Sequence, residues 1–166
     1  MVAYLAFTNE KWVVALRTLG GSNSINFWSP SPKKLLTEIE DVMLYFYAED
    51  SGGPRRYIHG RGKVKSFQVG TVKEAWERYG NKNGAANLRI FLKLLKEGQS
   101  ATEPVRETSP IGWHILDEVT WRSKPLDITD LGIRVKLGTW RGRRLEPWEE
   151  QRIIRDRDWG FPPPIL

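Results

Sequence analysis

The sequence predicts an α+β fold, a small mixed β-barrel of five or six strands flanked by helices. First, apolar and β-branched runs recur near positions 5, 27, 45, 60, 115 and 127, with the lengths that strands have. Second, helical patterns are inserted between these runs without the regular helix–strand alternation of a doubly wound sheet. Third, 166 residues with 40% hydrophobic content suit one domain with a substantial core.

The central strand is expected at residues 41–48, DVMLYFYA, because an unbroken apolar run of this length is typical of a strand buried on both faces. Residues 56–67 alternate apolar and basic side chains, which indicates a half-exposed hairpin partner. Glycines 60 and 62 within that run indicate a bulge or a close backbone approach. Further strands are expected at residues 2–8, 25–28, 111–121 and 126–128, the last two joined by a kink around Pro125.

Helical patterns are the second component of the prediction. Thr8-Asn9-Glu10 offers capping chemistry ahead of Trp12, Val13 and Leu16, which stand at helical spacing. Ser31 and Pro32 suit the start of a short helix over 33–40. Further helices are expected at residues 71–79, 87–96 and 147–157.

We expect residues 1–128 to form the domain and residues 129–166 to form a basic extension that packs on it. The chain has no cysteine, so disulfides, thiolate metal sites and a cysteine nucleophile are excluded. His59 and His114 lack ligand-like spacing, and acidic residues near strand ends, Asp50 among them, suit solvated turns. We therefore expect no metal and no cofactor. The absence of a long apolar run predicts a cytoplasmic protein without a membrane partner.

The charge distribution favours a nucleic-acid partner. The formal net charge is +6 and the isoelectric point is near 9.6, values typical of a phosphate-binding domain. Side chains two residues apart share one strand face, so three basic side chains of the 56–67 segment project together. The alternative is a solvated edge protected by lysines. The candidate phosphate-binding residues are Arg56, Arg61, Lys63, Lys65 and Arg141.

Eight tryptophans are present, and most of them are expected in the core. The remainder are candidates for a base-binding pocket, because proteins that read a single base hold it between aromatic or apolar side chains. Asn26 and Ser29 present the donors and acceptors that a base edge requires. The aromatic candidates are Trp28, Tyr47, Trp113 and Trp121.

Four segments carry a resemblance to a known superfamily: INFWSP, DVMLYFYA, HGRGKV and AWERYGNKNGA. Over residues 2–128 the chain resembles PUA-like proteins, which include EVE, ASCH and YTH domains, and most of all the PUA-like N-terminal modules of HNH endonucleases. Trp28-Ser29 is similar to the Trp-Ser element that supplies one tryptophan of the YTH aromatic cage. Ser109-Pro110-Ile111 is similar to the segment before a second cage tryptophan, which implies Trp113. The following spacing is shorter here than in YTH domains, which leaves Trp121 as a substitute.

The resemblance implies a non-enzymatic module that reads a modified, flipped base in an aromatic pocket, with DNA slightly favoured over RNA. It also implies a link to modification-dependent restriction. Since the chain has no HNH motif, the nuclease would be a separate subunit. Two alternatives stay open: an enzyme of nucleotide or RNA metabolism of the ASCH type, and a plain protein-interaction domain.

Overall fold

The computed structural model describes residues 1–18, 23–34, 36–38, 40–50, 53–97, 104–136 and 142–160. In chain order the elements are β1 (Val2–Phe7), α1 (Glu10–Thr18), β2 (Ile25–Ser29), β3 (Val42–Glu49), β4 (Arg56–Thr71), α2 (Val72–Tyr79), the 3₁₀ helix η1 (Gly80–Asn83), α3 (Leu88–Glu97), β5 (Pro110–Asp127), β6 (Arg143–Arg144), α4 (Pro147–Arg155) and β7 (Trp159–Gly160). No helix of this described part is long and apolar enough to cross a membrane.

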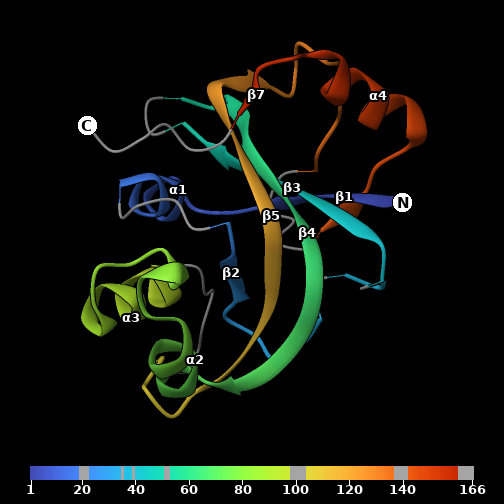
Figure 1. Ribbon diagram of the computed structural model, residues 1–166. Helices are drawn as coiled ribbons and strands as arrows, with labels where there is room; N and C mark the ends of the chain where they lie inside the picture. The colour runs from blue at the N-terminus through green and yellow to red at the C-terminus, as the bar shows by residue number, and fades with distance from the viewer. Residues whose placement is uncertain are drawn as a thin grey trace.

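The strands form one mixed sheet in the order β2-β5-β4-β3-β1-β6, with β7 paired to β5. Strands β1 and β3 are parallel, and the other pairs are antiparallel. The long strands β4 and β5 curve through the whole molecule (Figure 1), with α2 and α3 at one end and α4 at the other. The predicted α+β class with a mixed sheet is confirmed.

The predicted barrel closure is wrong. Among the described residues no strand pairing joins β2, at one edge of the sheet, to β6 at the other. Helix α1 lies inside the curve of the sheet, where Trp12, Val13 and Leu16 pack against side chains of β1, β2 and β3. Because the helix already covers this apolar face, and β6 has only two residues, the sheet is not completed into a barrel.

The bend of β4 depends on the two predicted glycines. The register of β4 shifts between Ile58 and Gly60 and again between Arg61 and Lys63 where it pairs with β5. A Cβ atom at Gly60 would lie 2.9 Å from the carbonyl oxygen of Thr120, and one at Gly62 would lie 2.9 Å from the Leu116 Cβ. Bulges that bend a strand occur where backbones approach this closely, so this prediction is confirmed.

Two predicted elements differ from the structure. The described residues of segment 33–40 form bends rather than a helix. The backbone there is held by the sheet instead, since Gly112 N–H donates to the Ser31 carbonyl at 3.1 Å and Leu36 is buried. The two strands expected on either side of Pro125 are one continuous strand, β5.

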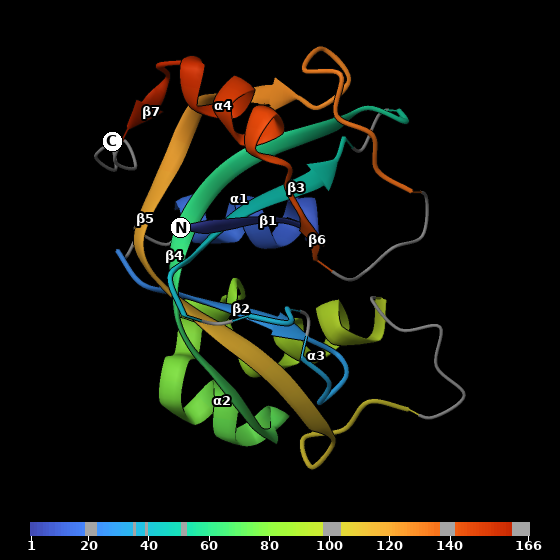
Figure 2. The ribbon, with the colours of Figure 1, turned by 90° about the vertical axis from the view of Figure 1, so that its right-hand side faces the viewer.

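Three apolar clusters hold the elements together. The first lies between α1 and the concave face of the sheet. The second joins α2 and α3 to the N-terminal half of β5. The third packs Ile153 of α4 on β1 and β3 at the opposite face, so that strands β3–β5 separate α4 from α1 (Figure 2).

Candidate functional site

The predicted cage aromatics do not line a common pocket among the described residues. Trp113 belongs to the cluster with α2 and α3, Trp121 to the cluster with α1, and Tyr47 to the cluster with α4. All three are at most 3% exposed. The indole N–H of Trp113 donates to Gln68 Oε1 at 3.2 Å. In this structure they are therefore core residues, and a base-binding role for them stays a prediction.

Trp28 and Asn26 meet at one residue of η1. The indole N–H of Trp28 donates to the Asn83 carbonyl at 2.8 Å, and its ring packs edge-on against Phe91 at 5.6 Å between centroids. The fully buried Asn26 amide donates to Asn83 Oδ1 at 2.7 Å. Ser29, also predicted to contact a base, is buried at the end of β2. The polar groups of Trp28 and Asn26 join β2 to η1, and the Ser29 hydroxyl accepts from the Ser31 N–H at 3.4 Å.

Three basic side chains of β4 share one face, but several of the predicted phosphate-binding residues already contact other side chains. The burial pattern alternates as predicted, with Arg61, Lys63 and Lys65 on the more exposed side. Lys65 Nζ lies 3.1 Å from Asp117, and Arg56 lies 3.1 Å from Glu49. The remaining candidate, Arg141, lies outside the described residues.

Arg61 also has partners in the structure, an aromatic ring and a hydroxyl group. Its guanidinium stacks over the Trp159 ring at 4.6 Å, and its Nε donates to Thr120 Oγ1 at 3.2 Å. Phosphate binding by the predicted basic set stays a prediction, and it would require these contacts to be exchanged.

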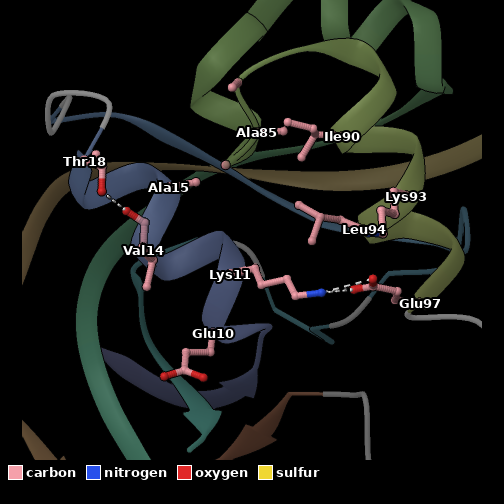
Figure 3. A pocket seen from close by; sticks show the side chains of 12 residues that line it. Glu10, Lys11, Val14, Ala15, Thr18, Ala85, Ile90, Lys93, Leu94 and Glu97 are labelled. Atoms are coloured by element: carbon pink, nitrogen blue, oxygen red, sulfur yellow. Dashed lines mark hydrogen bonds and ion pairs between the residues drawn. The ribbon is translucent and has the colours of Figure 1, made fainter. Parts of the chain in front are cut away.

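One hollow among the described residues is an apolar groove of about 610 Å³ between α1 and α3, the α1–α3 groove. Figure 3 shows Val14 and Ala15 of α1 facing it from one side and Ile90 and Leu94 of α3 from the other. Lys11 and Glu97 form an ion pair of 3.1 Å across it. Its lining is mainly apolar and two of its charged groups pair with each other, which leaves it few polar groups for selecting a ligand.

A smaller hollow in the described structure, of about 280 Å³, is lined by chemically active side chains, and we call it the His59 pocket. It is formed by Glu10, Asp50, Tyr57, His59 and Pro125. Glu10 is the first residue of α1, and Asp50 follows β3. Tyr57 and His59 stand two residues apart on β4. The pocket therefore lies where α1, β3, β4 and β5 meet, and Glu10 also lines the α1–α3 groove.

His59 is held as a neutral imidazole. Burial, which has the largest effect, and the nearby Arg17 guanidinium together lower its pKa to about 4, while Asp50 acts in the opposite direction. Arg17 also donates to the backbone carbonyls of His59, at 3.3 Å, and of Arg122, which ties β4 to β5 beneath the pocket. At neutral pH the imidazole can both donate and accept one hydrogen bond.

Sequence reasoning missed this pocket because its residues are spread over more than 110 positions. Glu10 was considered only as part of a helix start and Asp50 only as a solvated turn residue. The available signal was the spacing of Tyr57 and His59, which places both side chains on one face of a strand. Among the described residues no group of three or more histidine, cysteine or acidic side chains could hold a metal ion.

Comparisons with known proteins bear on the fold. No protein-family model matches the chain, and no curated protein matches it. The structure is similar to that of ASCH from Zymomonas mobilis, with a TM-score of 0.61, 13% sequence identity and 96% of both chains covered. Two mutant forms of that protein give TM-scores of 0.62 and 0.59, each at 13% identity and 92% coverage of this chain. Each match covers 94% or more of the other chain.

The likeness corrects one expectation. The chain was expected to be no enzyme, but the fold is shared with ASCH proteins, the type that the sequence had tied to its enzymatic alternative. That exclusion is therefore wrong. The likeness to HNH-linked modules is not among these findings. What the chain shares with the ASCH structures is their fold.

Proposed function

We propose that the protein is an ASCH-type module that binds RNA and takes one nucleotide unit of the strand into the His59 pocket. The observation that carries the proposal is a neutral imidazole beside two carboxylic acids in one hollow of about 280 Å³. Binding sites for small molecules begin at roughly 300 Å³. The volume suits a single small polar unit rather than a long segment.

The lining determines which part of a nucleotide enters. Glu10 and Asp50 repel phosphate but accept hydrogen bonds from the N–H groups of a base or the hydroxyls of a ribose. Tyr57 and Pro125 supply apolar surface beside them. The phosphates then stay outside, on a protein whose net charge is +6. A pocket that accepts hydroxyl donors favours RNA over DNA, because only RNA has the 2′-hydroxyl.

Cleavage of the bound RNA is a second candidate function, favoured by the state of His59. A neutral imidazole can accept the proton of a ribose 2′-hydroxyl, whose oxygen attacks the adjacent phosphorus outside the pocket. The bond to the 5′-oxygen of the next nucleotide breaks, a 2′,3′-cyclic phosphate forms, and the protonated imidazole returns its proton to the leaving oxygen. The low pKa of His59, about 4, makes it a weak base that is available at every pH above that value. The ASCH fold is compatible with this reading.

The test is a binding panel with matched single-stranded RNA and DNA, with and without methylated adenine or cytosine, read by fluorescence anisotropy at two salt concentrations. His59→Ala and Asp50→Asn should weaken RNA binding by about tenfold, the effect of losing one hydrogen bond worth roughly 1.4 kcal/mol. Asp130→Asn is the matched control, since Asp130 is exposed and does not line the pocket.

The same samples, run on a denaturing gel, test cleavage. Product formation that is lost in His59→Ala and retained in Asp130→Asn supports the second candidate function. Equal RNA affinity of the wild type and of both pocket variants would contradict the pocket as the binding site.

A further inference from the structure

Helix α4 presents one face to the sheet and another to solvent. Glu149 and Ile153 are its buried residues, and Ile153 packs in the cluster with Tyr45 and Tyr47. Residues four and three positions apart on a helix lie on the same side. Trp148, Arg152 and Arg155 therefore follow one another along the exposed side of α4, and we call these three residues the α4 stripe.

Trp148 is held in an unusual setting for so large an apolar side chain. It is 49% exposed, whereas Trp12, Trp113 and Trp121 are almost fully buried. The Arg152 guanidinium lies 4.9 Å from the centre of its ring. Arg152 is itself fixed, because its Nη1 donates to the Leu131 carbonyl at 2.7 Å. A positioned guanidinium thus orients an indole that remains open to solvent.

Arg155 completes the stripe with an available charge. It is exposed, and within the described part of the chain no ion pair or hydrogen bond engages it. Arg155 lies seven positions after Trp148, a rise of about 10 Å along the helix. The stripe therefore offers a flat aromatic surface and an available positive charge about two turns apart on one side of α4.

The chemistry of the stripe selects its ligand. An apolar protein partner would leave two arginines desolvated, which is costly without matching acids. A single-stranded nucleic acid satisfies both parts, because a base stacks on the indole while phosphates pair with the guanidinium groups. A duplex hides its bases in the stack and could use only the arginines.

We propose that the α4 stripe is a second nucleic-acid contact, which binds a single-stranded segment by stacking a base on Trp148 and pairing phosphates with Arg152 and Arg155. The proposal rests on the proposed function in that the protein must bind nucleic acid. It uses no residue of the His59 pocket, and α4 packs on the sheet face opposite α1, so the two contacts can fail separately.

The experiment uses the full chain with fluorescein-labelled oligo-U and oligo-dT, read by anisotropy over a salt series. Trp148→Ala should weaken binding about 5- to 150-fold, the loss that accompanies removal of one base–aromatic stack, and Trp148→Phe should restore part of it. Ile154→Ala is the matched control, because Ile154 is 42% exposed on the same helix but off the stripe. It should leave affinity unchanged.

Arg155→Gln tests the phosphate contact through the salt dependence of binding, which would not change if Arg155 had a purely structural role. Loss of one phosphate contact should lower the slope of log affinity against log salt by about 0.7 for a single strand. Circular dichroism should show the same melting temperature for Trp148→Ala, Arg155→Gln and the wild type, since neither side chain is in the core.

The outcomes show which of the two proposals, the pocket or the α4 stripe, fails. Wild-type affinity in Trp148→Ala, with weakened binding in His59→Ala, overturns the α4 stripe and leaves the pocket. The reverse pattern supports the stripe and overturns the pocket. A wild-type protein that binds neither oligonucleotide overturns both. Binding of anionic vesicles through Trp148, without binding of oligonucleotides, overturns nucleic acid as the ligand of the stripe.

Discussion

The indole N–H of Trp28 donates to the backbone carbonyl of Asn83 at 2.8 Å, so the end of β2 is fastened to η1. The side chain of Asn83 adds further hydrogen bonds to this connection. Its amide donates to the carbonyls of Ala75 and Gly80 at 3.0 and 2.9 Å, and its Oδ1 accepts from Asn26. One asparagine therefore connects β2, α2 and η1.

Replacing Trp28 with alanine should mainly reduce stability. The ring packs against two of the apolar clusters, so the expected loss is about 3 kcal/mol, at the lower end of the range for removal of a tryptophan from a core. Urea unfolding measures this loss. Binding of oligonucleotides, scaled to the folded fraction, tests the base-stacking role predicted for Trp28. A loss of affinity with unchanged stability would show that the packing role is the wrong one.

Asn83→Ala should lower the stability of the protein at least as much as Trp28→Ala does, although it removes a smaller side-chain volume. Two carbonyls and the buried Asn26 amide would lose their partners, and each buried group left without a hydrogen bond costs about 1–3 kcal/mol. Asn81→Ala is the control, because Asn81 is exposed on the same turn and no side-chain hydrogen bond engages it in the described structure. The melting temperatures of the two variants should differ clearly. Equal melting temperatures would contradict the role of Asn83 in connecting β2, α2 and η1.

Gly84→Ala should destabilise the protein through both backbone and packing. Gly84 has a φ of +75°, and a Cβ there would lie 2.7 Å from the Trp12 Cγ. Left-handed backbone costs an alanine about 1 kcal/mol, and overpacking adds about 1–3 kcal/mol. Gly53→Ala makes a suitable comparison, since a Cβ at Gly53 meets nothing within 4 Å. The free energies of unfolding of the two variants, measured by denaturant titration, should differ by about the sum of these terms, and similar values would contradict the clash.

The stability of the protein should fall as the pH decreases from about 6.5 to 4. Burial lowers the pKa of both His59 and His114 to about 4, so the unfolded chain takes up protons before the folded one does. The stabilisation is fully present above pH 6.5 and is lost as the pH approaches 4. Each histidine contributes a slope of up to about 1.4 kcal/mol per pH unit within that window.

His114 provides the sharper half of this test. It is fully buried, and neither ring nitrogen has a hydrogen-bond partner. His114→Leu should reduce the slope of unfolding free energy against pH by about half. Urea titrations between pH 5 and 6.5 isolate the effect, because most carboxylates titrate below that range. A slope that His114→Leu leaves unchanged would contradict a neutral buried imidazole.

Local pattern was sufficient for most elements of this fold. The apolar run of β3, the alternation of β4 and the helical spacing of α1 are each properties of neighbouring residues, and the burial they produce follows the pattern. Gly60 and Gly62 indicated a close backbone approach because only glycine lacks a Cβ. The composition also indicated a basic protein with a formal charge of +6.

The tertiary structure decided which side chains remained available. Trp121 is buried and Trp148 is half exposed, although both are tryptophans in regular elements, because α1 packs over the sheet face that carries Trp121 and Trp148 lies on the outer side of α4. Arg61 is paired with Trp159, almost a hundred residues away, and Glu10 and His59, about fifty positions apart, line the same pocket. Such pairs depend on how the sheet curves and which helix fills it, and no local pattern of residues encodes that.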